Sequence, residues 1–200
     1  MIKIVVLFIM MNVCLVTIYS QENCNIYKYK QELVRYQSCL KCKETQPYYQ
    51  FSKEYQQILD TAIKIDSNYY YPYKAKSVAY LKSGDFITWK KLIDKAVSLN
   101  PEKVLGYRAS CRYQFFHDYK GCIEDIENLE SMVKYDLGEI HNGDYHFKTI
   151  KAISYDAIDS TQKAIKTLDE HISSENYYPL IYDYLLMGYF YLKDGQYAKA

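Results

Sequence analysis

The chain has 200 residues, of which 49% are hydrophobic, so one domain or one repeat array with a real core is expected. Lys and Arg total 25 against 24 for Asp and Glu, and no long basic run is present. Because strong phosphate binding needs clustered positive charge, no nucleic-acid partner is expected. The small numbers of Gly (7) and Pro (4) favour long helices joined by short turns.

The first twenty residues have the pattern of a secretory signal peptide. Lys3 gives a short positive start, residues 4–18 are almost wholly apolar with Asn12 as the polar interruption, and Ser20 is a small residue suited to cleavage. This apolar run is shorter than the roughly 20 residues that span a membrane. We therefore expect an exported protein, in the periplasm, on an outer surface or secreted. It should contact a membrane only through an uncleaved or lipidated N-terminus.

An N-terminal helical segment is expected at 21–49, and it carries a CxxC motif from Cys39 to Cys42. In an exported protein this motif is compatible with a redox pair, with a disulfide or with half of a metal site. No strand pattern precedes it, and no second CxxC or paired His completes four zinc ligands. We expect a structural disulfide among Cys24, Cys39 and Cys42 and no bound metal. Redox or metal-binding chemistry at Cys39 and Cys42 is the alternative function.

Four short turn signals follow at intervals of 33 to 42 residues. Each comes after an apolar pattern of helical period, and an aromatic residue precedes the centre of each turn by four positions. Repeats of this length predict pairs of antiparallel helices. The turns centre on Gly84, His117, Asp159 and Gly195, and the preceding aromatics are Tyr80, Tyr113, Tyr155 and Tyr191.

These repeated stretches resemble the tetratricopeptide repeat family, in particular its exported bacterial members. The best match spans 107–126, with small residues in both helices, Tyr113 between them and a turn, and another match spans 187–200. The resemblance covers 50–200. It implies an all-α fold in which helix-turn-helix repeats stack into a right-handed superhelix. It also implies a scaffold for protein–protein interaction and not an enzyme.

Two antiparallel helices approach closely only where their facing side chains are small. We expect such contacts between Ser110 and Cys122 and between Ala152 and Ala164. Trp89 stands where the family has a small residue, so its helix pair should be tilted or shifted in register.

Two further features depart from a regular array. Residues 131–144 form an insertion whose two glycine-containing turns predict an ordered loop. The last repeat of the 50–200 array is incomplete, because Ala200 begins a second helix after a first helix at 182–193. The apolar face of that first helix is expected to need a continuation of the chain or a partner to cover it.

The sequence contains no nucleophile elbow, phosphate-binding glycine loop or HExxH motif, so we expect no catalytic residue and no cofactor. The adjacent carboxylates Glu124 and Asp125 are expected on a solvated helix face. By the resemblance, the concave groove binds a peptide or protein partner. The expected inner-face side chains are Lys74, Lys82, Tyr107, Arg108, Gln114, Tyr182, Tyr189 and Lys193.

Overall fold

The computed structural model describes residues 22–140, 143 and 145–200, so the predicted signal peptide at 1–20 lies outside the described residues. All regular elements in the described part are helices, and the one β-type contact there is an isolated bridge between Glu139 and His146. The predicted all-α fold is confirmed. The helices are α2 (Asn25–Tyr29), α3 (Leu33–Lys43), α4 (Lys53–Ile65), α5 (Tyr70–Ser83), α6 (Phe86–Leu99), α7 (Pro101–Cys111), the π-helical η1 (Arg112–Phe116), α8 (Tyr119–Met132), α9 (Phe147–Ala157), α10 (Thr161–Ile172) and α11 (Ile181–Lys193).

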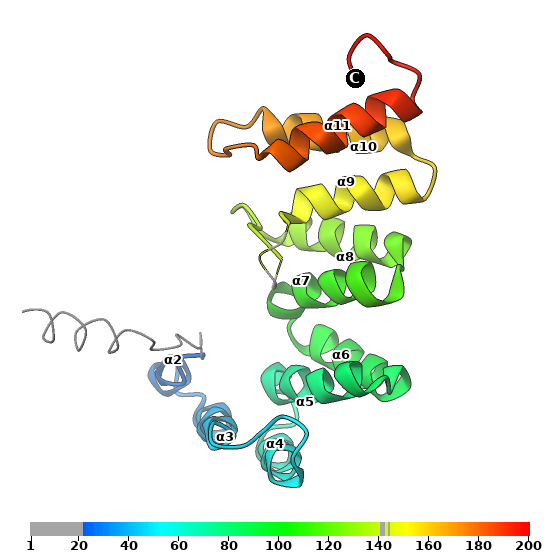
Figure 1. The fold of residues 1–200 in the computed structure, drawn as a ribbon. Coiled ribbons are helices and arrows are strands. Elements are labelled where there is room, and N and C mark those ends of the chain that lie inside the picture. The colour runs from blue at the N-terminus through cyan, green and yellow to red at the C-terminus, as the bar shows by residue number, and fades with distance from the viewer. Residues whose placement is uncertain (1–21, 141–142, 144) are drawn as a thin grey trace, which may run out of the picture.

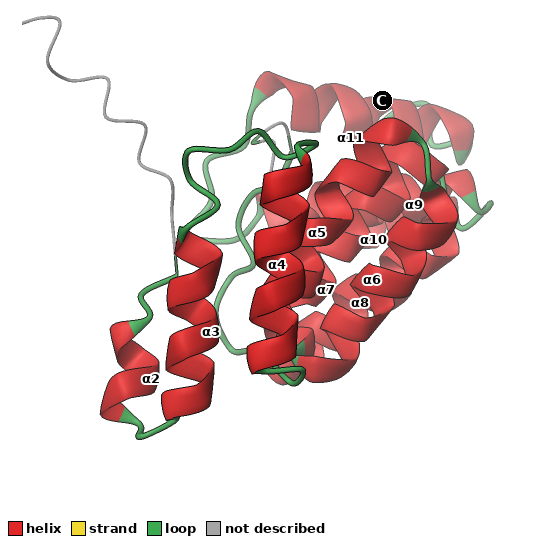
Figure 2. Cartoon of the chain, turned by 90° about the horizontal axis from the view of Figure 1, so that it is seen from below, coloured by secondary structure: helices red, strands yellow, loops and turns green. Residues whose placement is uncertain are grey.

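The helices stack in chain order as antiparallel pairs (Figure 1). α3 packs against α4, α5 against α6, α7 against α8 and α9 against α10, and each pair also contacts the next. Seen from below, the helices lie side by side, and the connections after α3 and α8 are longer than those within the α5–α6 and α9–α10 pairs (Figure 2). Because each helix contacts mainly its neighbours in sequence, the core extends along the stack as in a repeat protein. The expected N-terminal segment therefore contributes α3 as the first helix of the first pair.

Each of the four predicted turns contains a residue with a left-handed backbone. The φ angle is 82° at Gly84, 50° at His117, 59° at Asp159 and 76° at Gly195. The first three turns reverse the chain within a helix pair, and the fourth follows the end of α11. The four predicted turn positions are confirmed.

The residues after these turns also start the next helices. The Asp85 carboxylate accepts a hydrogen bond from the backbone N–H of Thr88, and the Asp118 carboxylate accepts one from Gly121, both at 3.0 Å. These N–H groups have no carbonyl partner within their own helix, so each cap stabilises the first turn of α6 and α8.

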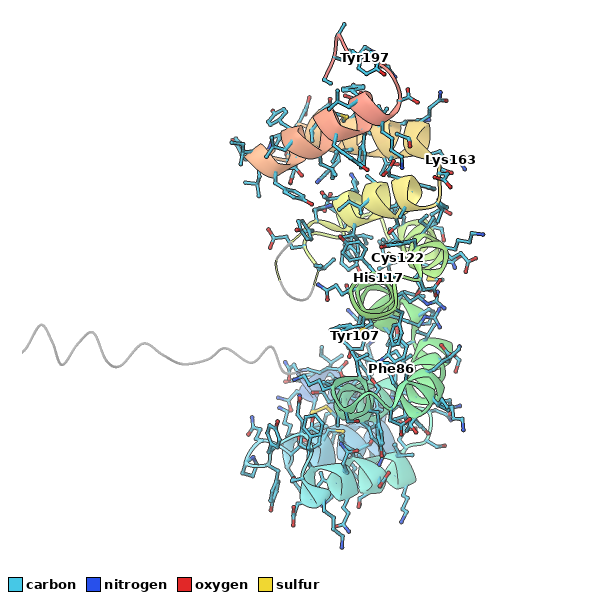
Figure 3. All side chains as sticks on the ribbon, turned by 45° about the vertical axis from the view of Figure 1, so that its right-hand side comes forward. Phe86, Tyr107, His117, Cys122, Lys163 and Tyr197 are labelled. Carbon is cyan, nitrogen blue, oxygen red and sulfur yellow. A yellow bond between two sulfur atoms is a disulfide. The ribbon has the colours of Figure 1, made fainter. Side chains whose placement is uncertain are left out.

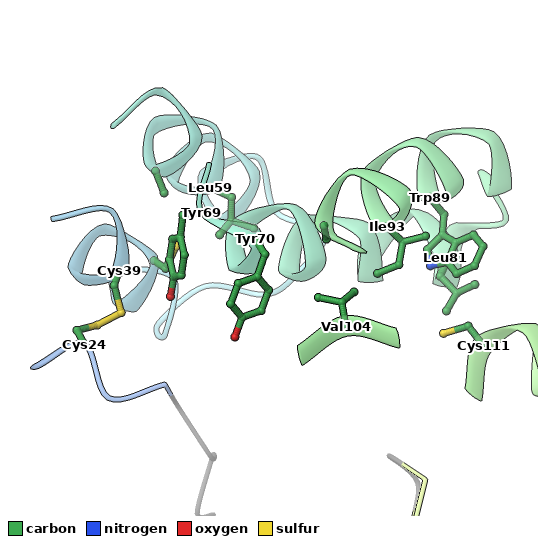
Figure 4. Close-up of a cluster of buried hydrophobic side chains, with 13 residues drawn as sticks. Cys24, Cys39, Leu59, Tyr69, Tyr70, Leu81, Trp89, Ile93, Val104 and Cys111 are labelled. Carbon is green, nitrogen blue, oxygen red and sulfur yellow. A yellow bond between two sulfur atoms is a disulfide. The ribbon is translucent and has the colours of Figure 1, made fainter. Parts of the chain in front are cut away.

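The N-terminal end of the stack is held together by a disulfide between Cys24 and Cys39 (Figure 4) and by the carboxylate of Glu22. Glu22 accepts hydrogen bonds from the hydroxyls of Tyr27 at 2.6 Å, of Tyr70 at 3.1 Å and of Tyr69. Cys24, Cys39 and Tyr69 are all buried in the first core cluster. Segments far apart in sequence are thereby held together at this end.

Small residues occupy the closest contacts of the next two core clusters. Ala109 and Cys122 share the second cluster, Ala152 and Ala164 share the third, and all four are fully buried. Ser110 is also buried, and its hydroxyl donates to a backbone carbonyl of its own helix. The sequence prediction of close packing near these positions agrees with this burial.

A buried carboxylate joins α6, α7 and α8. Asp125 accepts from Arg108 Nε at 2.9 Å and from Arg108 Nη2 at 2.6 Å, and it lies 3.2 Å from Arg112 Nη1. Arg108 also donates to Asp94 of α6 at 2.8 Å. The sequence interpretation of Asp125 as a solvated carboxylate is therefore wrong, because its side chain is 1% exposed and paired, whereas Glu124 is exposed.

The left-handed turn at Asp159 gives a first prediction. Asp159→Gly is expected to raise the free energy of unfolding by up to about 1 kcal/mol, because a left-handed backbone costs an L-residue roughly 1–2 kcal/mol and costs glycine almost nothing. Urea unfolding measures the change. Gly84→Ala is the matched control: the added Cβ meets open space, so its expected loss of about 1 kcal/mol comes from the backbone alone. An Asp159→Gly variant without increased stability would contradict the assigned turn.

Candidate functional site

Aromatic side chains gather around a hollow beside η1. This hollow of about 400 Å³ opens between η1, the start of α8, Tyr145 and Ile153 of α9. His117 marks this place at the turn between η1 and α8 (Figure 3). The residues that line it are Tyr113, Gln114, Phe115, His117, Tyr119, Tyr145 and Ile153.

A smaller hollow of about 150 Å³ adjoins the first. Tyr145 lines both, and its ring centroid lies 4.9 Å from that of Tyr182 in the second. We call the two together the tyrosine groove. The second hollow is lined by Glu139, Gly143, Tyr145, His146, Thr149, Tyr177, Tyr178, Leu180, Tyr182 and Asp183.

We call the whole segment between α8 and α9, residues 133–146, the insertion, and it places Tyr145 where the two hollows meet. The Ile140 N–H donates to the Tyr145 carbonyl at 2.9 Å, and the Phe147 N–H donates to the Gly138 carbonyl at 3.0 Å. His146 then caps α9, because its Nδ1 accepts from the Lys148 N–H at 3.0 Å. These bonds fix the backbone at Tyr145 and His146.

Three of the groove tyrosines, Tyr113, Tyr177 and Tyr182, have a raised pKa and are neutral phenols at physiological pH. Burial and the neighbouring Tyr145 raise the pKa of Tyr113 to about 12. Burial and then the hydrogen bond with Tyr145 raise the pKa of Tyr182, and burial and then Asp183 raise the pKa of Tyr177. A neutral phenol presents an apolar ring with one hydroxyl that can donate or accept, which suits the mixed surface of a peptide.

A stack of three rings supports the second hollow from behind. His171 of α10 is fully buried between His146 and Tyr177, with ring centroids 4.1 Å and 3.7 Å away. Neither nitrogen of His171 has a hydrogen-bond partner in the described part of the chain. The Tyr177 side chain is also held at its hydroxyl group, which donates to Asp183 at 2.8 Å. The stack therefore holds the insertion and the segment before α11 against α10.

Protonation of His171 should weaken this support in acid. Burial, and then His146 and Lys148, lower the pKa of His171 from 6.5 to about 4, against the smaller opposing effect of Asp183 and Asp136. Between these values the unfolded chain binds a proton that the folded chain does not, so stability falls as the pH drops from about 6.5 to about 4. The loss reaches at most about 3 kcal/mol.

The variant His171→Phe tests this, because it keeps a buried ring and removes the titration. Urea unfolding of both proteins at neutral pH and near pH 4 gives the measurement. The stability of the variant relative to the native protein is expected to rise in acid, while the other titrating groups cancel in the difference. An unchanged difference would show that His171 does not titrate within this window.

Two of the predicted groove residues line the tyrosine groove, and two more lie further along α11 and line neither hollow. Gln114 lines the first hollow and Tyr182 the second. Tyr189 is 52% exposed on α11. Lys193 forms an ion pair of 2.9 Å with Asp156 of α9, which ties α11 to the preceding pair.

The other four lie apart from it. Lys74 is half-buried with its ammonium 5.2 Å from the centre of the Tyr107 ring, at the boundary between α5 and α7. Lys82 is exposed and donates to the side chain of Gln50 at 3.1 Å. The assignment of Arg108 to an open groove is wrong, because its guanidinium points to the carboxylates of α6 and α8 and neutralises a buried charge there.

The sequence analysis missed most of the tyrosine groove. Tyr145 comes from the insertion, whose contacts no repeat pattern predicts, and Tyr177 and Tyr178 come from the segment before α11. The available signal was the high tyrosine content, but the 25 tyrosines are spread over both halves of the chain, so this signal does not locate the groove.

Cys39 and Cys42 of the CxxC motif do not form a redox pair among the described residues. Cys39 is bonded to Cys24 and not to Cys42. Burial raises the pKa of the thiols of Cys42, Cys111 and Cys122 to about 12, so they are poor nucleophiles. No cluster of three metal-ligating side chains occurs within the described residues.

Comparison with known proteins rests on the fold, because no family model and no curated protein matches the sequence significantly. The MamA RS-1 ArsTM double mutant is similar with a TM-score of 0.59 at 15% identity, over 84% of this chain and 86% of that chain. Pseudomonas aeruginosa PilF is similar with a TM-score of 0.59 at 13% identity, over 85% and 73%. The Naa15/Naa10 complex bound to HypK-THB gives a TM-score of 0.50 at 18% identity, over 86% of this chain and 25% of that chain.

These solved structures are tetratricopeptide repeat proteins. The chain has a tetratricopeptide-type repeat fold. At such low identities the likeness shows the fold alone, so what the array binds has to be argued from its own surface. No helix among the described residues is long and apolar enough to cross a bilayer.

Proposed function

We propose that this repeat array is an exported, non-enzymatic scaffold that binds an extended segment of a partner protein in the tyrosine groove. The repeat fold supports protein interaction in general. The observation that carries the proposal is the contact between Tyr145 and Tyr182, which joins two hollows into one continuous aromatic surface. An extended segment long enough to reach from η1 to the start of α11 would contact both hollows.

The chemistry of the groove favours a peptide over a small charged ligand. Tyr178 is 90% exposed and Phe115 is 54% exposed, so large rings are available without rearrangement. Aromatic rings of this kind add contact area at low conformational cost. The tyrosine hydroxyls can form hydrogen bonds with the backbone of an extended chain. The hydroxyl of Tyr177 is the exception, because it already donates to Asp183. The partner segment is expected to be rich in apolar and polar uncharged residues.

A display library of extended peptides, selected on the mature protein, tests the groove. Tyr178→Ser and Tyr182→Ser are expected to weaken the selected peptides by about tenfold or more each, as is typical of exposed aromatic residues at the centre of an interface. Tyr29→Ser in α2 is the matched control, because Tyr29 is 86% exposed and lies outside the groove. Equal losses in all three variants, or none in the groove variants, would place the binding surface elsewhere.

Export is supported by the predicted signal peptide and by the Cys24–Cys39 disulfide, since such bonds persist in oxidising compartments.

The chain expressed with its own N-terminus in a secreting host is expected to appear outside the cytoplasm with residues 1–20 removed. Alkylation after denaturation without reductant should label the three thiols of Cys42, Cys111 and Cys122. Reduction should cost about 3 kcal/mol of stability for this loop length. Retention in the cytoplasm with all cysteines labelled would contradict the proposal.

A further inference from the structure

A separate hollow of about 570 Å³ lies between α6 and the segment that runs from α7 through η1 to the start of α8. None of the residues that line it lines the tyrosine groove. Its size falls in the range of ligand-binding pockets in proteins, which are mostly apolar with a few placed polar groups. We call it the Trp89 cleft.

The floor and one wall of the Trp89 cleft are aromatic and aliphatic. The ring of Phe116 stacks on Trp89 at 4.6 Å and meets Phe86 edge-on at 4.9 Å. Phe86 is 46% exposed and Ile87 is 73% exposed, whereas Trp89 is almost fully buried beneath them. Figure 3 shows Phe86 at the boundary between the α5–α6 pair and the next pair. An apolar side chain inserted here would contact all four residues.

Two departures from a regular repeat create the cleft. Trp89 occupies a position where the sequence resemblance led us to expect a small residue, and its indole fills the contact between α6 and the following helix. α7 passes into the π-helical η1, and this wider turn brings Phe116 onto Trp89. Single π-helical turns are found frequently at functional sites, where they re-aim side chains.

The rim of the cleft carries more positive than negative charge. Lys90, Lys91, Arg108 and Arg112 line it against the two carboxylates Asp94 and Asp118. Three of these cations already have carboxylate partners: Lys90 and Arg108 share Asp94, and Arg112 pairs with Asp118. Lys91 has no ion pair among the described residues, although the more distant Asp85 attracts it. One positive charge beside exposed Ile87 is therefore left for a ligand.

We propose that the Trp89 cleft is a second docking site, which takes an aromatic or aliphatic side chain of a partner protein with a carboxylate next to it in sequence. The apolar side chain enters between Ile87, Phe86 and Phe116, and the carboxylate meets Lys91. Binding at the Trp89 cleft does not require binding at the tyrosine groove. The proposal for the cleft therefore holds whether or not a peptide binds in the tyrosine groove.

Trp89 is the sole tryptophan of the chain, so its fluorescence reports occupancy of the cleft directly. The probe is the blocked tetrapeptide acetyl-Gly-Glu-Phe-Gly-amide, titrated into the mature protein with selective excitation of tryptophan. We expect a saturable change in Trp89 emission. The matched peptides acetyl-Gly-Gln-Phe-Gly-amide and acetyl-Gly-Glu-Ala-Gly-amide should bind about threefold and about tenfold more weakly, because each lacks one of the two contacts.

Variants at exposed positions separate the site from the fold. Ile87→Glu is expected to weaken the first peptide about tenfold or more and Lys91→Ala about threefold. Lys95→Ala, on the exposed surface of α6 outside the cleft, and Tyr178→Ser in the tyrosine groove should leave binding unchanged. The proposal is overturned by an unchanged Trp89 emission up to the solubility limit, by equal binding of the Gln and Glu peptides, or by Ile87→Glu binding as the native protein does.

Discussion

The pairing of buried Asp125 with Arg108 and Arg112 sets the geometry on which both candidate surfaces depend. A carboxylate this deeply buried is tolerated only when opposite charges and hydrogen bonds replace its hydration. Arg108 binds it from α7 and reaches Asp94 in α6, while Arg112 binds it from the first residue of η1. The spacing of three helices and the π-helical turn is therefore fixed by one network. Removing Arg108 would leave buried Asp125 with Arg112 as its one remaining ion pair among the described residues, and removing Asp125 would leave Arg108 with Asp94 alone.

η1 is the element that the two surfaces share. Consecutive residues at its end face different ways: Phe116 closes the Trp89 cleft, while Phe115 and His117 line the tyrosine groove. The left-handed backbone of His117 then turns the chain into α8, where Asp118 caps the helix and pairs with Arg112. A change in the ion network would therefore alter the walls of both hollows together, although no residue lines both.

The parts of the fold that the sequence predicts well are those set by neighbouring residues. Turn positions follow from Gly84, the caps and the aromatic four residues earlier, all within a few residues of each other. The placement of Arg108 failed for the opposite reason: which face of α7 meets α6 and α8 depends on how the pairs pack. One buried acid on another helix decides that Arg108 points inward. Asp125 was misassigned for the same reason, because nothing local distinguishes it from exposed Glu124.

The tyrosine groove illustrates a further limit of repeat-based inference. A repeat pattern predicts what successive units have in common, whereas Tyr145 belongs to an insertion found in one unit only. Its position follows from two backbone bonds across the loop and from His146, which caps α9 and stacks on His171. That stack contains a buried ring with no hydrogen-bond partner in the described chain, so it contributes packing without polar compensation. The loop that completes the candidate binding surface is thus held in part by His171, whose lowered pKa predicts that acid weakens the stack, so the surface and its stability are linked through one side chain.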